Sequence, residues 1–293
     1  MRNIHINTIS ENTNNANIKN STLKIFIITD IHLRKDVDGN ENLVNSGTKE
    51  GRTFYASHSK LRNFVDITNI EKPDLILYLG DFCDNPHDFE FFFNEINKIT
   101  NIRKEFTIGN HDFDNMSYED LVQVFNFTEK EEIGKSKFNK SFSIVKENFS
   151  VKFLMLDVNF DLNGNHQGTA RGRINLNSLS WINSEINNSN EDYIFICSHI
   201  LPHLYDYPSN WVYFEEAHAY DLQNIINASG KKVYAIGGHV HTPIIKEYKN
   251  LGNNFLGYGM PDCIETETGK FTVLTISKNN FNLFERELIY PYF

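Results

Sequence analysis

Five short polar motifs in the chain combine side chains of the types that bind metal ions. They are Asp30-x-His32, Gly80-Asp81-x-x-Asp84, Gly109-Asn110-His111-Asp112, the single His199 and Gly238-His239-x-His241. Residues two apart on an extended chain project to the same side, so each Asp-x-His or His-x-His pair can reach one ion. Seven of their side chains supply two carboxylates, four imidazoles and one amide oxygen, enough for two metal ions that share a bridging ligand; they are Asp30, His32, Asp81, Asn110, His199, His239 and His241.

A centre of this composition would attract phosphate esters. Two divalent ions, two carboxylates and a bridging hydroxide leave about one positive charge. Two ions about 3.5–4 Å apart lower the pKa of a bridging water toward roughly 7, and the hydroxide can attack phosphorus in line with the leaving oxygen. Mixed oxygen and nitrogen ligands without thiolate suit manganese, iron, zinc or cobalt.

Each motif follows a short run of apolar, β-branched or aromatic residues. The runs are Leu23–Thr29, Leu75–Leu79, Glu105–Ile108, Tyr193–Ser198 and Val233–Ile236. Such runs are typical of strands that are buried on both faces. Amphipathic stretches with helical spacing lie between them, namely Lys60–Ile70, Phe89–Ile99, Tyr118–Phe125, Leu179–Ile186 and Tyr220–Ala228. Alternating strands and helices predict an α/β sandwich with the motifs on one rim, outside the carboxyl ends of the strands.

Other segments complete the predicted architecture. Ser117 is the expected N-cap of the third helix, and Gly230 the expected stop of the last. Two hairpins are predicted, at 141–156 and 271–287, and we expect both to lie largely in a second sheet. The polar segment 36–57 has the length of a lid or loop beside the site. The phenylalanines between positions 89 and 93 are interpreted as core rather than as a platform for bases.

Composition limits the class of protein and of partner. The chain has 293 residues, 40% of them hydrophobic, which is enough to bury a core. Its net charge of −10 disfavours a long nucleic-acid partner. Cys83, Cys197 and Cys263 are too few and too scattered for a disulfide framework, and fit a reducing compartment.

No segment is rich enough in Gly, Ser or Pro to be a linker between two domains, which suggests one domain. Residues 1–21 are polar and rich in Asn, and we interpret them as a tail or at most an added edge strand. No apolar run reaches the length of a membrane span, and the tail lacks the pattern of a signal peptide. The sequence therefore predicts a single domain over 22–293 in a cytoplasmic protein without a membrane partner.

The five motifs in this order resemble those of the calcineurin-like metallophosphoesterase superfamily. The resemblance implies a four-layer α-β-β-α sandwich, with two mixed sheets flanked by helices, and a centre of two divalent or mixed-valence ions. It implies one ion held by Asp30, His32 and His241, a second held by Asn110, His199 and His239, and Asp81 as the bridge. It also implies that His111 is the catalytic histidine, with Asp84 as its orienting partner. Manganese or iron is expected from the resemblance, with zinc as an alternative.

The motifs of this chain differ from those of two subgroups of the superfamily, which argues against membership in either subgroup. Asn85 and Asp112 stand where protein Ser/Thr phosphatases have Arg and Glu, and no Tyr follows Asp81 at the distance seen in purple acid phosphatases. The segment Arg171-Gly-Arg173 is similar to one in cyclic-nucleotide phosphodiesterase-type and ADP-ribose pyrophosphatase-like enzymes. Arg171 and Arg173 are therefore candidate substrate-binding residues, although a surface ion pair is the commoner fate of loop arginines. His203 is a further candidate because it lies four residues after His199, with a plain loop histidine as the alternative.

The leading hypothesis is a metal-dependent hydrolase of small phosphate esters. Phosphodiesters or nucleotide pyrophosphates are the expected substrates, attacked in line by a hydroxide that bridges the two metals. The alternatives are a phosphomonoesterase with the same fold, a nuclease, and a non-catalytic interaction module. The acidic composition disfavours the nuclease, and the complete ligand set disfavours the non-catalytic module.

Overall fold

The computed structural model describes residues 3–4, 22–34, 56–83, 85–202, 214–249, 254–264 and 268–288. The described strands are β1 (Asn3–Ile4), β2 (Leu23–Ile28), β3 (Leu75–Leu79), β4 (Arg103–Thr107), β5 (Lys140–Val145), β6 (Ser150–Met155), β7 (Tyr193–Cys197), β8 (Val233–Thr242), β9 (Lys246–Lys249), β10 (Phe255–Pro261), β11 (Lys270–Ile276) and β12 (Phe281–Glu287). The described helices are α1 (Ser57–Glu71), α2 (Pro86–Ile96), the short 3₁₀ helix η3 (His111–Phe113), α3 (Tyr118–Val124), α4 (Leu176–Asn188) and α5 (Glu216–Ser229).

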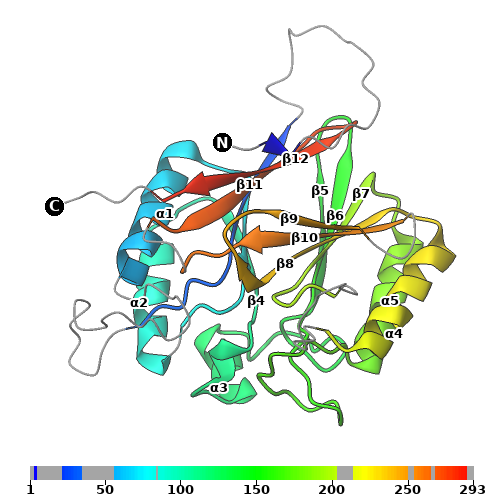
Figure 1. The fold of residues 1–293 in the computed structure, drawn as a ribbon, viewed down its shortest axis with the longest axis horizontal. Helices are drawn as coiled ribbons and strands as arrows, with labels where there is room; N and C mark the ends of the chain where they lie inside the picture. Colours follow the sequence, from blue (N-terminus) through cyan, green and yellow to red (C-terminus); the bar gives the residue numbers. More distant parts are fainter. Residues whose placement is uncertain are drawn as a thin grey trace, which may run out of the picture.

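The strands form two mixed sheets that pack face to face. One has the order β1-β12-β11-β2-β3-β4, and the other β5-β6-β7-β8-β10-β9. Figure 1 shows α1 and α2 on one side of the pair of sheets and α4 and α5 on the other. The predicted four-layer sandwich of two mixed sheets flanked by helices is confirmed.

Three hydrophobic clusters separate the four layers. Along β2, Phe26 and Ile28 pack toward α1 and α2, whereas Ile25 and Ile27 pack against the second sheet. This alternation follows from the two-residue period of a strand. A third cluster, which includes Leu222, joins the second sheet to α4 and α5. The central strands are thus covered on both faces, which explains their continuous apolar sequence.

The hairpin formed by β11 and β12 lies in the first sheet, so its assignment to the second sheet was wrong. β11 pairs antiparallel with β2, with Val273 opposite Phe26. Val273 packs toward the helices and Leu274 toward the second sheet. Both faces of this strand are therefore covered, one by the helices and one by the second sheet, as its place inside the first sheet requires. The hairpin of β5 and β6 does belong to the second sheet.

The ends of two helices and the state of the cysteines agree with the sequence. Ser117 caps α3 in a capping box with Asp120, and Gly230 ends α5 in a left-handed conformation at φ +68°, both as predicted. The three cysteines are buried and free. Within the predicted tail, Asn3–Ile4 pairs with β12, and most of the predicted lid at 36–57 lies outside the described residues. No helix in the described ranges is long and apolar enough to cross a bilayer.

The phenylalanines of α2 belong to the core or pack against it, as interpreted from the sequence. Phe92 is fully buried, and its ring centroid lies 5.0 Å from that of Phe82 and 5.7 Å from that of Tyr78. We expect Phe92→Ala to lower the free energy of unfolding by about 3–5 kcal/mol because it leaves a cavity among aromatic rings. Urea unfolding measures the loss, with the half-buried Phe91→Ala as the milder control. A cost below about 1 kcal/mol for Phe92→Ala would contradict this packing.

Candidate metal centre

The predicted ligands lie where the two sheets meet, at the carboxyl ends of their central strands. Asp30 and His32 follow β2, and Asp81 follows β3. The backbone pairing continues past these strands, because the Asp30 N–H donates to Gly80 O and the His32 N–H donates to Asp81 O. The second sheet contributes His199, two residues after β7, and two histidines near the end of β8. The single rim predicted from the sequence is thus built from both sheets.

One group of side chains combines Asp30, His32, Asp81 and His241. Their ligand atoms all lie within 4.8 Å of one another. His241 Nε2 lies 3.2 Å from Asp30 Oδ1, and His32 Nε2 lies 3.5 Å from Asp81 Oδ2. Such a cluster of two carboxylates and two imidazoles has the composition and spacing of a transition-metal site.

A second group combines Asp81, His199 and His239 within the same distance limit. His199 Nε2 lies 3.0 Å from Asp81 Oδ2. Asp81 belongs to both groups, which is the arrangement of a carboxylate that bridges two ions. The fully buried carboxylates of Asp30 and Asp81 therefore share one polar centre.

Asn110 lies next to the shared carboxylate. It is buried, and the N–H of the following residue, His111, donates to Asp81 Oδ1 at 2.8 Å. The two histidines of β8 separate, with His241 in the first group and His239 in the second. The structure thus places the two histidines in different groups of side chains, and their assignment to particular ions stays a prediction.

The backbone explains this separation. Nine non-glycine residues in the described ranges have positive φ, and five of them are predicted ligands. These five are Asp30 (53°), His32 (44°), Asp81 (53°), His239 (69°) and His241 (47°). Left-handed backbone is disfavoured for such residues and persists where surrounding structure imposes it. Its concentration here indicates that the chain turns sharply to direct each side chain into the centre.

Buried polar atoms without a hydrogen-bond partner show that the centre formed by the two groups fits metal ions. In the described part of the chain, Asp81 Oδ2, Asn110 Oδ1 and His199 Nε2 are buried and form no hydrogen bond of ordinary geometry. Buried polar atoms normally have partners, so three such atoms in one place need another ligand. The other nitrogen of His199, Nδ1, donates to Leu79 O at 2.8 Å, so Nε2 is the nitrogen that can bind a metal ion once it is deprotonated. The donor set therefore fits cations, and together with the comparisons below it suggests a dinuclear site.

The electrostatics keep both carboxylates ionised. Burial raises the pKa of Asp81, but His199, His32 and His111 outweigh that effect and hold the pKa well below its usual range. Burial also opposes the ionisation of Asp30, and again the neighbouring His241 and His199 bring its pKa down. Burial lowers the pKa of His239 to about 3, and the charge of His199 acts in the same direction. The centre thus presents two anions and a neutral His239, which are forms that bind metal. Burial opposes the charge of His199, but Asp81 and Asp30 outweigh it and raise the pKa of His199 to about 9, so this ring must release its Nε2 proton when an ion binds.

Asp112 holds the two loops that carry Asp81 and Asn110. Its carboxylate accepts backbone N–H bonds from Gly109, Asp81 and Phe82 at 2.8–3.0 Å. This is the backbone-capping role expected of a short acidic side chain after a strand. Burial, followed by the charge of Asp81, raises the pKa of Asp112 to about 7, although the bonds from Gly109 and Phe82 act in the opposite direction.

His111 lies at the edge of the centre, with its ring centroid 5.1 Å from that of His32. Its Nδ1 lies 2.8 Å from Asp114 Oδ2. The sequence did not single out Asp114, because its contact with His111 three residues earlier depends on the 3₁₀ turn of η3. The orienting partner implied by the resemblance, Asp84, lies outside the described residues.

A segment that we name the strap, residues 166–173, passes beside the second group. The carbonyl of Ala170 lies 3.1 Å from His239 Nε2, and a Cβ on Gly168 would overlap Asn110 O. Arg171 and Arg173 both lie within ion-pair distance of Glu215, at 3.5 and 3.2 Å. The structure thus shows the ion pair that was the alternative for these arginines, and their contact with substrate stays a prediction. The third substrate-binding candidate, His203, lies outside the described residues.

The backbone at Gly238 lies directly against the side chains of Thr29 and Asp30. A Cβ at this position would overlap Thr29 Oγ1 and Asp30 Oδ2. We expect Gly238→Ala to displace the carboxylate and to lower metal affinity about tenfold or more, because metal sites depend on such supporting contacts. Equilibrium dialysis against Zn²⁺ measures the affinity. Gly230→Ala is the control, because its positive φ makes it strained but nothing surrounds it within 4 Å. Equal affinities in the two variants would contradict the prediction.

A family model described as calcineurin-like phosphoesterase matches residues 23–243, a range that includes all seven predicted ligands. A curated relative, the probable glycerophosphodiester phosphodiesterase GpdQ of Arcobacter nitrofigilis, is 27% identical over 148 residues. That match covers 50% of this chain and 49% of the relative, so the chain spans about half the length of the curated relative it matches.

Solved structures share the fold at low sequence identity. A dimetal phosphatase from Danio rerio aligns with a TM-score of 0.67 at 14% identity, over 92% of this chain and 97% of its own. A purple acid phosphatase from yellow lupin (Lupinus luteus) seeds aligns with a TM-score of 0.59 at 15% identity, over 92% of this chain and 52% of its own. At these identities the likeness supports the fold.

Proposed function

The chain belongs to the calcineurin-like phosphoesterase family, and from this premise we propose that it is a metal-dependent hydrolase of small phosphate esters. The observation that carries the proposal is Asp81, whose buried carboxylate belongs to both ligand groups. We assign Asp30, His32 and His241 to one ion and Asn110, His199 and His239 to the other, with Asp81 between them. Manganese or iron is the proposed metal, with zinc as the alternative, as the resemblance to the superfamily implies; the mixed oxygen and nitrogen donors suit all three.

Phosphodiesters or nucleotide pyrophosphates are the proposed substrates. The relative from Arcobacter nitrofigilis is named for a diesterase activity, which supports the diester over the monoester. The net charge of −10 restricts positive potential to the metal centre and so favours small substrates. The three buried, free cysteines suit a reducing compartment, and the cytoplasmic location stays a prediction.

The proposed roles follow from the hydrogen bonds of the centre. Two bound divalent ions would supply sites for the non-bridging phosphoryl oxygens and an activated water at neutral pH. The contact between His111 Nδ1 and Asp114 fixes the tautomer in which Nδ1 carries a proton. Protonated also at Nε2, the ring can donate to a phosphoryl oxygen or to the leaving group. Asp112 keeps the loops of Asp81 and Asn110 at a fixed separation through its three backbone bonds.

Hydrolysis of two chromogenic esters tests the proposal. The purified chain, loaded in turn with Mn, Fe, Zn and Mg, is assayed with bis(p-nitrophenyl) phosphate and with p-nitrophenyl phosphate. We expect turnover of the bis-ester to exceed that of the monoester. A preference for the monoester would replace the diesterase proposal by the phosphomonoesterase alternative. Absence of turnover with every ion would contradict the hydrolase proposal.

A further inference from the structure

A pocket separate from the metal centre lies between the start of α4, the start of α5 and the turn at 160–164. Its volume is about 380 Å³, and it is lined by residues 160–164 and 173–177, Lys135 and His218. None of the seven predicted metal ligands lines it. Ligand pockets in proteins typically measure about 300–1,000 Å³, so this volume suits a small molecule. The strap lies between the two sites, because Ala170 contacts His239 and Arg173 lines the pocket.

Two cations of the lining have hydrogen-bond donors to offer. Lys135 is exposed, and its ammonium forms no ion pair or hydrogen bond with any described residue. The Arg173 side chain is 12% exposed and uses Nε on Glu215 and Nη1 on Phe160 O and Thr169 Oγ1. Its other terminal nitrogen, Nη2, forms no hydrogen bond within the described ranges. Ammonium and guanidinium groups whose N–H donors are not already used can bind anions.

The neutral and acidic groups of the lining also favour an anion. His218 Nδ1 accepts the Ile174 N–H at 3.2 Å, so the proton of the neutral ring is on Nε2, which is then a donor. Asp161 is the one carboxylate among the residues that line the pocket. Its Oδ1 already accepts the N–H groups of Asn163 and Asn165, and its Oδ2 accepts Asn165 Nδ2. The lining is therefore rich in donors, with its acidic group already bound.

The same lining contains two exposed leucines. Leu162 is 79% exposed and Leu176 is 70% exposed, and they are among the few large hydrophobic side chains exposed in the described residues. Two such side chains on one pocket indicate that part of its ligand is apolar. The pocket thus combines an anion-binding wall with an apolar one.

We propose that this pocket binds a small organophosphate with a short apolar chain. Lys135, Arg173 and His218 receive the phosphate group, and the chain covers Leu162 and Leu176. The proposal rests on the pocket alone, and does not require that the metal centre hydrolyse phosphate esters.

The test is a titration of the full-length, Zn-loaded protein with butyl phosphate, followed through backbone amide NMR signals. We expect saturable shifts of the amides at 161–164 and 174–177, in the wild type and equally in Asp81→Asn. Lys135→Gln is expected to weaken this binding about tenfold, because it removes one charged hydrogen bond. Inorganic phosphate is expected to bind about tenfold more weakly than butyl phosphate, since it buries no apolar surface.

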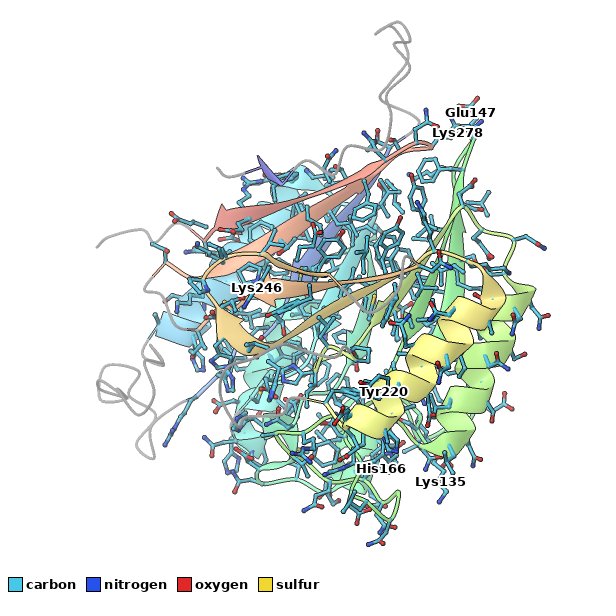
Figure 2. All side chains as sticks on the ribbon, turned by 45° about the vertical axis from the view of Figure 1, so that its right-hand side comes forward. Lys135, Glu147, His166, Tyr220, Lys246 and Lys278 are labelled. Atoms are coloured by element: carbon cyan, nitrogen blue, oxygen red, sulfur yellow. The ribbon has the colours of Figure 1, made fainter. Side chains whose placement is uncertain are left out.

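Lys278→Gln is the matched control, because it removes the same charge from an exposed turn. Figure 2 shows Lys135 and Lys278 at opposite ends of the molecule. Equal affinities of Lys135→Gln and the control, or shifts confined to amides around Asn110, would overturn the proposal. Equal affinities for butyl phosphate and inorganic phosphate would overturn the assignment of the apolar wall. Because Asp81→Asn lacks the shared metal ligand, its binding of butyl phosphate separates this proposal from the hydrolase proposal.

Discussion

Asp81→Asn is expected to lose bound metal and phosphoesterase activity together. The carboxylate belongs to both ligand groups, and its replacement by an amide removes the anionic ligand that both ions would share. Loss of a supporting residue around a metal site costs about 10–100-fold in affinity, so loss of the shared ligand should cost more than about a hundredfold. Metal content per chain, measured by inductively coupled plasma mass spectrometry after gel filtration, and turnover of bis(p-nitrophenyl) phosphate check this result.

Asp66→Asn is the matched control for this change. Asp66 is exposed on α1, so the same removal of a carboxylate should leave metal content and turnover at the wild-type level. If Asp81→Asn retained the wild-type metal content, the carboxylate could not be the shared ligand. The unfolding transitions of both variants, recorded in parallel, separate loss of metal from loss of fold.

His111→Ala is expected to retain metal but to lose turnover by about 10²–10⁴-fold, the usual contribution of a general acid or base. The side chain lies beside the centre, with its Nδ1 on Asp114, and belongs to neither ligand group. Its backbone N–H on Asp81 Oδ1 is retained in the alanine variant, so the shared carboxylate stays in place. Metal content and kcat of the same preparation give the two readings.

His87→Ala, on the exposed surface of α2, controls for the loss of an imidazole. Full activity in His111→Ala would remove this residue from the mechanism. A drop in metal content equal to the drop in turnover would instead make His111 a metal ligand.

The parts of the fold that could be predicted are those whose signal lies within one segment. The bounds predicted for β3, Leu75–Leu79, coincide with the observed ones because this strand is buried on both faces and is apolar throughout. The capping box at Ser117 and the left-handed Gly230 are equally local. The sheet that contains β11 and β12 depends on pairing with β2, more than 240 residues away in sequence, and no local pattern encodes that choice.

In the candidate site, too, the features encoded within one segment could be predicted and those that depend on tertiary structure could not. Residue types and the strands before them identified the side chains that meet in the centre. The extended-chain rule could not foresee the left-handed backbone at His239 and His241, which sends these neighbours to different groups. The contact between His111 and Asp114 depends on a 3₁₀ turn that follows β4, and the pocket beside the strap depends on segments separated by up to about 80 residues.

Anomalous diffraction from crystals of the protein grown with Mn²⁺ would locate the proposed pair of metal ions. Seven side chains are proposed to hold two ions around Asp81, and data collected on both sides of the metal absorption edge locate such ions without reference to activity. We expect two peaks about 3.5–4 Å apart, one bounded by Asp30, His32 and His241 and the other by Asn110, His199 and His239. A single peak, or peaks that do not touch Asp81, would contradict this expectation.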